Sequence, residues 1–295
     1  AALLRTSGTH CYRLAVDQGD SSRSHNGVCV ATELRHCVSV RGGEKQPPAD
    51  RRSETTATRA VGMEHATDDL VAVAAEAATA SGDYLRAAFR AGSVDGEFSN
   101  RDVKAAADRE SETQIKAVID DHYPNHAFHG EEAGHVGESD YRWVVDPLDG
   151  TNNFASGYPK FATAVATLYE NKPVAAAIYE PLTTELYLAE RDAGATLNDK
   201  PLTATTSLPL EHGTVALVVG LSVVTDPDGL TQVRTLEAAL RGQCKRVVTT
   251  WAPCVDWGLL ARGSIEGLVC VQPDIYEQHA GSLLAAESGI IADDT

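Results

Sequence analysis

Residues 143–154 read Trp-Val-Val-Asp-Pro-Leu-Asp-Gly-Thr-Asn-Asn-Phe, a stretch that combines a strand signal with two acids and a glycine turn. The apolar run at its start leads directly into the two carboxylates, Asp146 and Asp149. Two acids this close together on a tight turn can bind hard divalent cations. Gly150 and Thr151 then open the next segment, where unpaired backbone N–H groups suit a phosphate. A cation beside a phosphate indicates metal-assisted phosphoryl chemistry.

The string from Asp146 to Phe154 resembles the first motif of the inositol monophosphatase family. That family belongs to the lithium-sensitive, Mg²⁺-dependent phosphatases, together with archaeal fructose-1,6-bisphosphatases. An Asx turn that only caps a helix is the simpler interpretation, but it would account for the Asp-Gly pair alone. A calcium-binding EF-hand loop is excluded, because its twelfth position needs a bidentate Glu and Gly157 stands there.

Three further segments resemble the family. Glu131, in Gly130-Glu131-Glu132, matches a metal ligand by this resemblance, and Asp108, in the stretch 102–112, matches the acid that helps to hold and activate the attacking water. Asp274 matches the acid that completes a second metal site. Relatives read Trp-Asp-x-x-Ala-Gly there, whereas in this chain a proline precedes the Asp and the Ala280-Gly281 pair comes later than expected. A helix N-cap is the alternative role for both Asp108 and Asp274.

The resemblance implies a site for two or three Mg²⁺ ions, with Mn²⁺ as a possible substitute. Glu131, Asp146 and the carbonyl group of Leu148 would hold one ion, and Asp146, Asp149 and Asp274 would hold another. All of these groups are oxygen donors, which suit Mg²⁺ and disfavour zinc.

The same resemblance implies which residues bind the phosphate and which orient the attacking water. The N–H groups of Gly150 and Thr151 would bind the phosphate, while Thr151 and Asp108 would orient a metal-activated water for in-line attack. The substrate would be a small polyol or sugar phosphate of the inositol-1-phosphate or fructose-1,6-bisphosphate class. Inositol-processing relatives have a hydroxyl-binding Glu seven residues before the last metal acid. Counting back from Asp274 gives Gly267, so that carboxylate is absent or moved and specificity for myo-inositol is in doubt.

Two alternatives stay open. One is a non-catalytic family member that senses a phosphorylated metabolite or assembles with a partner, and the other is a 3′-phosphonucleotide phosphatase. All four expected metal acids are present, which favours catalysis. The resemblance also implies a homodimer.

The chain has 295 residues, is 43% apolar and carries a net charge of −17. A protein this acidic repels nucleic acid and anionic membranes, so we expect neither as a partner. The longest apolar stretch, residues 215–224, is too short to span a bilayer.

Acid excess with few lysines resembles proteins of salt-loving archaea, although an ordinary acidic bacterial protein is the alternative. The six cysteines form no CxxC pair, which indicates buried thiols in a reducing, cytoplasmic setting.

Residues 1–62 lack helical or strand periodicity, and we expect a non-globular N-terminal extension. Met63, the only methionine, precedes a good helix start and is the expected initiator, with a disordered tail or a targeting peptide as competing interpretations. Residues 63–295 would form the phosphatase domain, which is short at its C-terminus because relatives continue with a further strand and helix.

The remaining pattern predicts an α+β fold. A β-rich first half is followed by alternating strands and helices, which indicates stacked layers, and the resemblance implies an αβαβα sandwich of the inositol monophosphatase and fructose-1,6-bisphosphatase type. The expected helices span residues 63–90, 109–121, 230–240, 254–261 and 275–287. The expected strands span residues 126–129, 143–146, 161–169, 174–179, 215–219, 246–250 and 267–271, with a hairpin over 185–197.

Overall fold

The computed structural model describes residues 9–14, 54–92, 96–98, 103–205 and 208–294. An eight-stranded sheet has the order β11-β10-β9-β8-β7-β6-β4-β5, in which β4 and β6 are parallel and the other neighbours antiparallel. Its strands are β4 (Ala127–Gly130), β5 (Gly134–Val136), β6 (Tyr141–Asp149), β7 (Ala162–Tyr169), β8 (Lys172–Glu180), β9 (Glu185–Glu190), β10 (Gly194–Leu197) and β11 (Lys200–Leu202).

A second sheet has five strands in the order β13-β12-β14-β1-β15. Strand β12 runs parallel to β13 and β14, whereas β1 is antiparallel to β14 and β15. A separate two-stranded antiparallel sheet consists of β2 and β3. These strands are β1 (Thr9–Leu14), β2 (Gly96–Phe98), β3 (Val103–Ala105), β12 (Thr214–Val219), β13 (Arg246–Val248), β14 (Gly267–Val271) and β15 (Ile290–Asp294).

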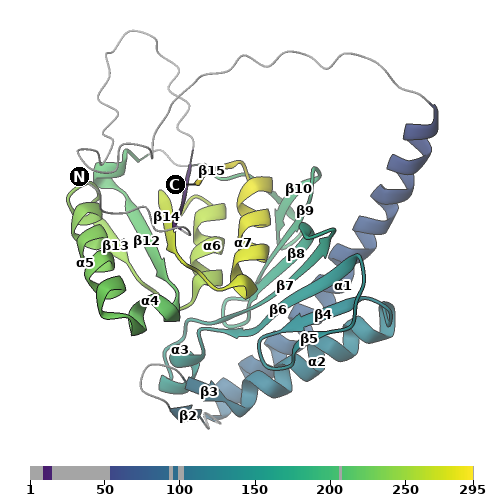
Figure 1. The fold of residues 1–295 in the computed structure, drawn as a ribbon, viewed down its shortest axis with the longest axis horizontal. Coiled ribbons are helices and arrows are strands. Elements are labelled where there is room, and N and C mark those ends of the chain that lie inside the picture. Colours follow the sequence, from purple (N-terminus) through teal and green to yellow (C-terminus); the bar gives the residue numbers. More distant parts are fainter. Residues whose placement is uncertain (1–8, 15–53, 93–95, 99–102, 206–207, 295) are drawn as a thin grey trace.

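The helices separate the sheets into layers (Figure 1). Helices α1 and α2 cover one face of the larger sheet, α6 and α7 lie between the two sheets, and α5 covers the outer face of the smaller sheet. The predicted αβαβα sandwich is therefore confirmed. The helices are α1 (Glu54–Ala91), α2 (Ala106–His122), α3 (Thr151–Ser156), α4 (Leu221–Thr225), α5 (Pro227–Arg241), α6 (Pro253–Ala261) and α7 (Ile275–Glu287), with a 3₁₀ turn at Leu210–His212.

Both faces of the larger sheet are buried, so its central strands are apolar at successive positions. In β7, Ala164 and Ala166 pack in the core shared with α6 and α7, whereas Val165 between them packs in the core shared with α1 and α2. The small alanine side chains leave room for the two inner helices. The period-two alternation of a strand thus assigns neighbouring residues to two separate cores.

The N-terminal region differs from the expectation in two described elements. The helix expected from Met63 begins at Glu54, and residues 9–14 form β1, inserted between β14 and β15. Strand β1 is held by backbone pairing with β14 and β15. Such pairing does not require alternating side chains, so the sequence of β1 shows no strand periodicity. The other residues before Glu54 lie outside the described part of the chain, and the boundary at residue 62 stays a prediction.

Two smaller expectations concern the cysteines and the membrane. Cys244, Cys254 and Cys270 are free and buried, as predicted. Within the described ranges, no helix is both long enough and apolar enough to cross a lipid bilayer.

Candidate active site

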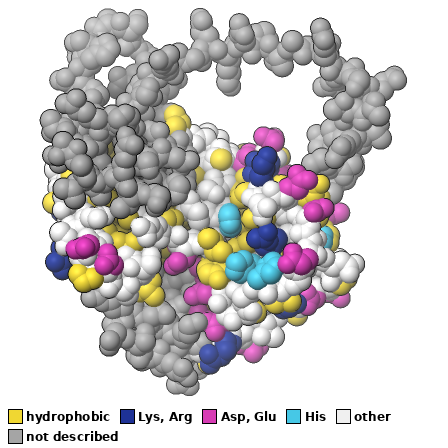
Figure 2. Space-filling view, in the orientation of Figure 1, with side chains coloured by type: hydrophobic (Ala, Val, Ile, Leu, Met, Phe, Trp, Pro, Cys, Tyr) yellow, Lys and Arg dark blue, Asp and Glu magenta, His cyan; other side chains and the backbone are white. Residues whose placement is uncertain are grey.

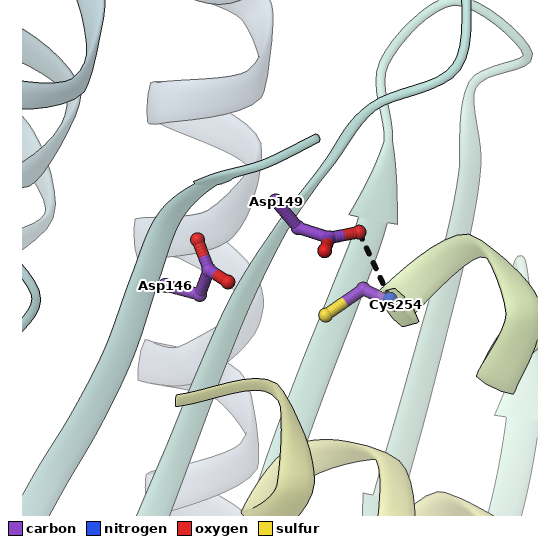
Figure 3. Close-up of side chains that lie close together, drawn as sticks. All are labelled: Asp146, Asp149 and Cys254. Atoms are coloured by element: carbon purple, nitrogen blue, oxygen red, sulfur yellow. Dashed lines mark hydrogen bonds between the residues drawn. The ribbon is translucent and has the colours of Figure 1, made fainter. Parts of the chain in front are cut away.

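The two acids of the central motif lie at the end of β6 and are both buried, with 6% and 4% of Asp146 and Asp149 exposed. In a regular strand, residues three apart point to opposite faces. Here the register shifts, because Asp146 pairs with Ala164 and Asp149 with Ala162, so β6 contains one residue more than β7 over this span. The extra residue returns both carboxylates to the same side. Figure 3 shows the two side chains facing a common space.

Local hydrogen bonds fix this irregular segment. The N–H of Leu148 donates to Oδ1 of Asp146 at 3.2 Å, and the hydroxyl of Thr163 on β7 donates to the carbonyl of Pro147 at 3.1 Å. The carboxylate of Asp146 is therefore held before any ligand binds.

Gly150 opens helix α3 in the left-handed conformation, with φ of 88°. A Cβ atom at this position would lie 2.9 Å from the carbonyl oxygen of Lys160 and 3.1 Å from Cβ of Ala252. Only glycine fits this turn without strain. The N–H groups at the start of a helix have no intrahelical acceptor, and the phosphate-binding role of Gly150 and Thr151 stays a prediction.

Thr151 connects the motif to Asp108. Its hydroxyl lies 3.1 Å from Oδ1 of Asp108 and 3.0 Å from the carbonyl oxygen of Leu148, and one proton serves both acceptors. Asp108 is the third residue of α2 rather than its N-cap, and it is 3% exposed. The structure thus brings together Asp108, Leu148 and Thr151 as predicted.

Glu131 follows β4 and is exposed, but its charge acts directly on Asp146. The loop that carries it is held by the buried carboxylate of Glu112, which accepts the N–H groups of Glu132 and Ala133 at 2.8 and 2.7 Å. A Cβ at Gly130 would overlap this carboxylate. Glu112 is a supporting residue that the sequence did not single out, because its contact is made twenty residues away in the chain.

The predicted second-site acid is placed differently. Asp274 is exposed and forms a capping box at the start of α7 with Glu277, so the structure supports the alternative role of helix N-cap for Asp274. Glu277 is buried, and its charge acts on both Asp146 and Asp149. It also stands three residues before Ala280-Gly281, so Tyr276-Glu277-x-x-Ala-Gly keeps the spacing of the family's aromatic-acid-x-x-Ala-Gly pattern. That spacing is the signal that could have identified Glu277.

The N-terminus of α6 completes the site from the opposite layer. The N–H of Cys254 donates to Oδ2 of Asp149 at 2.9 Å, and the N–H of Val255 also contacts this carboxylate. The positive end of the helix dipole stabilises the negative charge of Asp149.

Electrostatics show how strongly these acids interact. Burial raises the pKa of Asp146 well above its usual range, and the charges of Glu131 and Asp149 raise it further. Burial also raises the pKa of Asp149, with Glu277 as the largest neighbouring charge. Burial raises the pKa of Glu277 to about 8. Bound cations relieve such repulsion, and the oxygen donors present fit Mg²⁺. Figure 2 shows acidic side chains down the middle of this face, where β6 ends and α3 begins.

Comparison with known proteins agrees with this geometry. The model of the inositol monophosphatase family matches residues 66–293. A Nus factor SuhB of Vibrio cholerae is 29% identical over 197 residues, which are 66% of this chain and 73% of that protein. A fructose-1,6-bisphosphatase/inositol-1-monophosphatase of Aquifex aeolicus is 31% identical over 196 residues, which are 65% of this chain and 72% of that protein. The structure of an inositol monophosphatase from Anabaena superposes with a TM-score of 0.66 at 26% identity, covering 75% of this chain and 82% of that one.

Proposed function

The chain belongs to the inositol monophosphatase family, and from this premise we propose that it is a Mg²⁺-dependent phosphomonoesterase acting on a small polyol or sugar phosphate. One observation carries the proposal: the carboxylates of Asp146, Asp149 and Glu277 are buried together beside the hydrogen-bonded pair Asp108–Thr151. Acids that are buried together and have raised pKa values are typical of a metal site.

The residues divide into two sets of ligands. We propose Glu131, Asp146 and the carbonyl of Leu148 for one ion, and Asp146, Asp149 and Glu277 for the other. Glu277 takes the place that the resemblance had assigned to Asp274. When bound, Mg²⁺ would neutralise charge and lower the pKa of a coordinated water. Mn²⁺ has the same preference for oxygen donors and is the proposed substitute.

The chain itself positions the water and the phosphate. The hydroxyl of Thr151 and the carboxylate of Asp108 form a pair that can orient a water and accept its proton. The N–H groups of Gly150 and Thr151 would bind phosphate oxygens at the start of α3. A nucleophilic side chain is not required, because a water attacks the phosphorus.

One residue difference from inositol-processing relatives narrows the range of expected substrates. Counting seven residues back from Glu277 gives Cys270, which lies in β14 and is fully buried, where inositol-processing relatives have the hydroxyl-binding Glu. A buried thiol cannot accept hydroxyl hydrogen bonds as a carboxylate does. This favours a sugar phosphate such as fructose-1,6-bisphosphate over inositol-1-phosphate, and a 3′-phosphonucleotide is the next candidate.

A non-catalytic role is the second candidate function. It is favoured by the relatives named Nus factor SuhB, a name that describes a factor rather than a phosphatase. In that case the site, with cations bound to its acids, would hold a phosphorylated metabolite without hydrolysing it. We further propose a homodimer, and a small phosphorylated metabolite rather than nucleic acid or membrane as the partner.

The test is inorganic phosphate release by the full chain in high KCl, with and without Mg²⁺. The panel contains fructose-1,6-bisphosphate, inositol-1-phosphate, glycerol phosphates and 3′-phosphoadenosine 5′-phosphate. We expect Mg²⁺-dependent release that Asp149→Asn abolishes and that the exposed control Asp121→Asn leaves intact. If folded protein releases no phosphate from any compound, the phosphatase proposal is wrong and the non-catalytic role is favoured.

A further inference from the structure

The thiol of Cys254 lies within the acid cluster. One carboxylate oxygen each of Asp146 and Asp149 and the sulfur of Cys254 lie within 4.8 Å of one another. All three residues are buried, and Cys254 is fully so. Figure 3 shows the sulfur directed into the space that the two carboxylates face, while the backbone of the same residue binds Asp149.

The position of this sulfur is fixed by the backbone. Cys254 is the second residue of α6, and its N–H holds Oδ2 of Asp149 at 2.9 Å. The side chain is therefore anchored beside the carboxylate by the same residue that neutralises part of its charge. No large movement is needed for a cation to contact both groups.

Two of the other cysteines, Cys244 and Cys270, are buried in different surroundings. The thiol of Cys244 donates to the carbonyl groups of Leu240 and Arg246 at 3.1 and 3.4 Å. Cys270 lies inside strand β14. Of the three buried cysteines Cys244, Cys254 and Cys270, only Cys254 shares a group of candidate metal ligands with two acids.

The group formed by Asp146, Asp149 and Cys254 offers a sulfur donor in addition to oxygen donors. Sulfur prefers borderline and soft ions such as Zn²⁺ and Cd²⁺, whereas Mg²⁺ takes oxygen ligands almost exclusively. Zinc bonds of about 2.3 Å to sulfur and about 2.0–2.2 Å to oxygen imply ligands roughly 3.3–3.8 Å apart in a tetrahedron. The candidate ligand atoms lie within 4.8 Å of one another, so a contraction of at most about 1–1.5 Å would bring them to these separations.

We propose that Cys254 is a sulfur ligand that gives the Asp146–Asp149 site a second, Zn²⁺-type binding mode, which competes with Mg²⁺. The inference rests on the proposed metal site. The thiol proton leaves to solvent as the metal–sulfur bond forms, and no electron is transferred. Zn²⁺ held in this way would occupy the acids that Mg²⁺ requires, so a thiophilic ion would displace the activating ion.

The test uses Cd²⁺ as the probe, because a thiolate bound to Cd²⁺ has a charge-transfer absorption in the ultraviolet. One equivalent of Cd²⁺ is added to the metal-free full chain, and Cd²⁺ and Mg²⁺ affinities are measured by calorimetry. The proteins compared are the unaltered chain, Cys254→Ser, Asp149→Asn and the control Cys244→Ser. We expect the absorption in the unaltered chain and in Cys244→Ser, and its loss in Cys254→Ser together with at least a tenfold weaker Cd²⁺ affinity.

Two comparisons separate the possible failures. If Cys254→Ser keeps both the absorption and the Cd²⁺ affinity, the proposal is overturned, whatever the phosphatase assay shows. If Cys254→Ser does not fold, Asp149→Asn decides: loss of the absorption there supports the shared site, and an unchanged absorption contradicts it. Phosphate release with Mg²⁺ tests the proposed function separately, because it does not depend on a bound sulfur.

Discussion

Single side chains connect the two halves of the candidate active site. The carboxylate of Asp149 accepts the N–H of Cys254, a residue 105 positions away in the chain. The amide of Asn153 donates to the carbonyl groups of Lys160 and Thr250, at 2.8 Å each. The turn that is proposed to bind phosphate is thereby fixed against the segment that leads into α6. The bond to Asp149 is buried and the two from Asn153 are partly buried, so the loss of a partner would be costly at each of them.

Trp251, in the segment that these bonds hold, has an unusual backbone. Its φ is 59°, which bulky residues rarely adopt, and the side chain is 52% exposed. We expect Trp251→Gly to be more stable than Trp251→Ala by about 1 kcal/mol, because only glycine takes this conformation without strain. Urea unfolding of both variants measures the difference. At Tyr158, equally exposed but without positive φ, the order should reverse. Equal stability of the two Trp251 variants would contradict the strained backbone.

At the scale of elements, the contact between α6 and α7 sets the position of the second proposed ligand group. A Cβ added to Gly281 on α7 would overlap ring atoms of Trp257 on α6, a side chain with no exposed surface. The two helices therefore approach as closely as glycine allows. Glu277 lies one turn before Gly281, on the same side of α7. Packing at Gly281 and placement of the Glu277 carboxylate are thus coupled.

We expect Gly281→Ala to lower the free energy of unfolding by about 1–3 kcal/mol, because an added methyl group must displace a fully packed indole. The same shift should move Glu277 and reduce Mg²⁺ affinity. Thermal unfolding and calorimetry measure the two effects. Ala286→Ser, at an exposed position of the same helix, is the control and should change stability by less than about 0.5 kcal/mol. If Gly281→Ala is as stable as the unaltered chain, the close approach of the helices is not as described.

At the scale of the whole molecule, the parts that the sequence predicts are those set by local pattern. Helix α7 has the predicted bounds, and Asp146 and Asp149 lie together because motif and turn are contiguous. In the sequence, only the spacing to Ala280-Gly281 distinguishes Glu277 from Asp274 as the second-site acid. Both acids start the same helix, and only the packing of α7 decides which one is buried.

Contacts between distant segments account for what pattern reasoning missed. Glu112 looks like one acid among several on α2 until the loop after β4 folds onto it. Strand β1 is defined by pairing with β14 and β15, which lie more than two hundred residues further along the chain. Neither the loop contact nor the strand pairing has a signal in the neighbouring residues, because the partner supplies the reason for the conformation.

A buried carboxylate outside the metal site makes global stability depend on pH. Glu180 ends β8 and is 3% exposed. Its Oε2 lies 3.9 Å from Nζ of Lys160, and its Oε1 has no hydrogen-bond partner among the residues that the structure describes. Burial raises the pKa of Glu180 to about 7, although the nearby charge of Lys160 opposes this. The folded state therefore binds a proton that the unfolded state releases near its ordinary pKa of 4.5. Unfolding free energy must fall as pH rises between these two values.

We expect Glu180→Gln to remove this contribution, because an amide keeps the shape of the side chain and carries no charge. The variant should gain stability relative to the unaltered chain between pH 4.5 and pH 7, by up to about 3 kcal/mol, and the gain should stay constant above pH 7. Urea unfolding at pH 5 and pH 8 measures the change, with the exposed Glu211→Gln as the control. A stability difference that does not vary with pH would mean that Glu180 stays ionised in the folded protein. The ion pair with Lys160 would then offset the burial of its charge, and the carboxylate would contribute equally to stability at both values of pH.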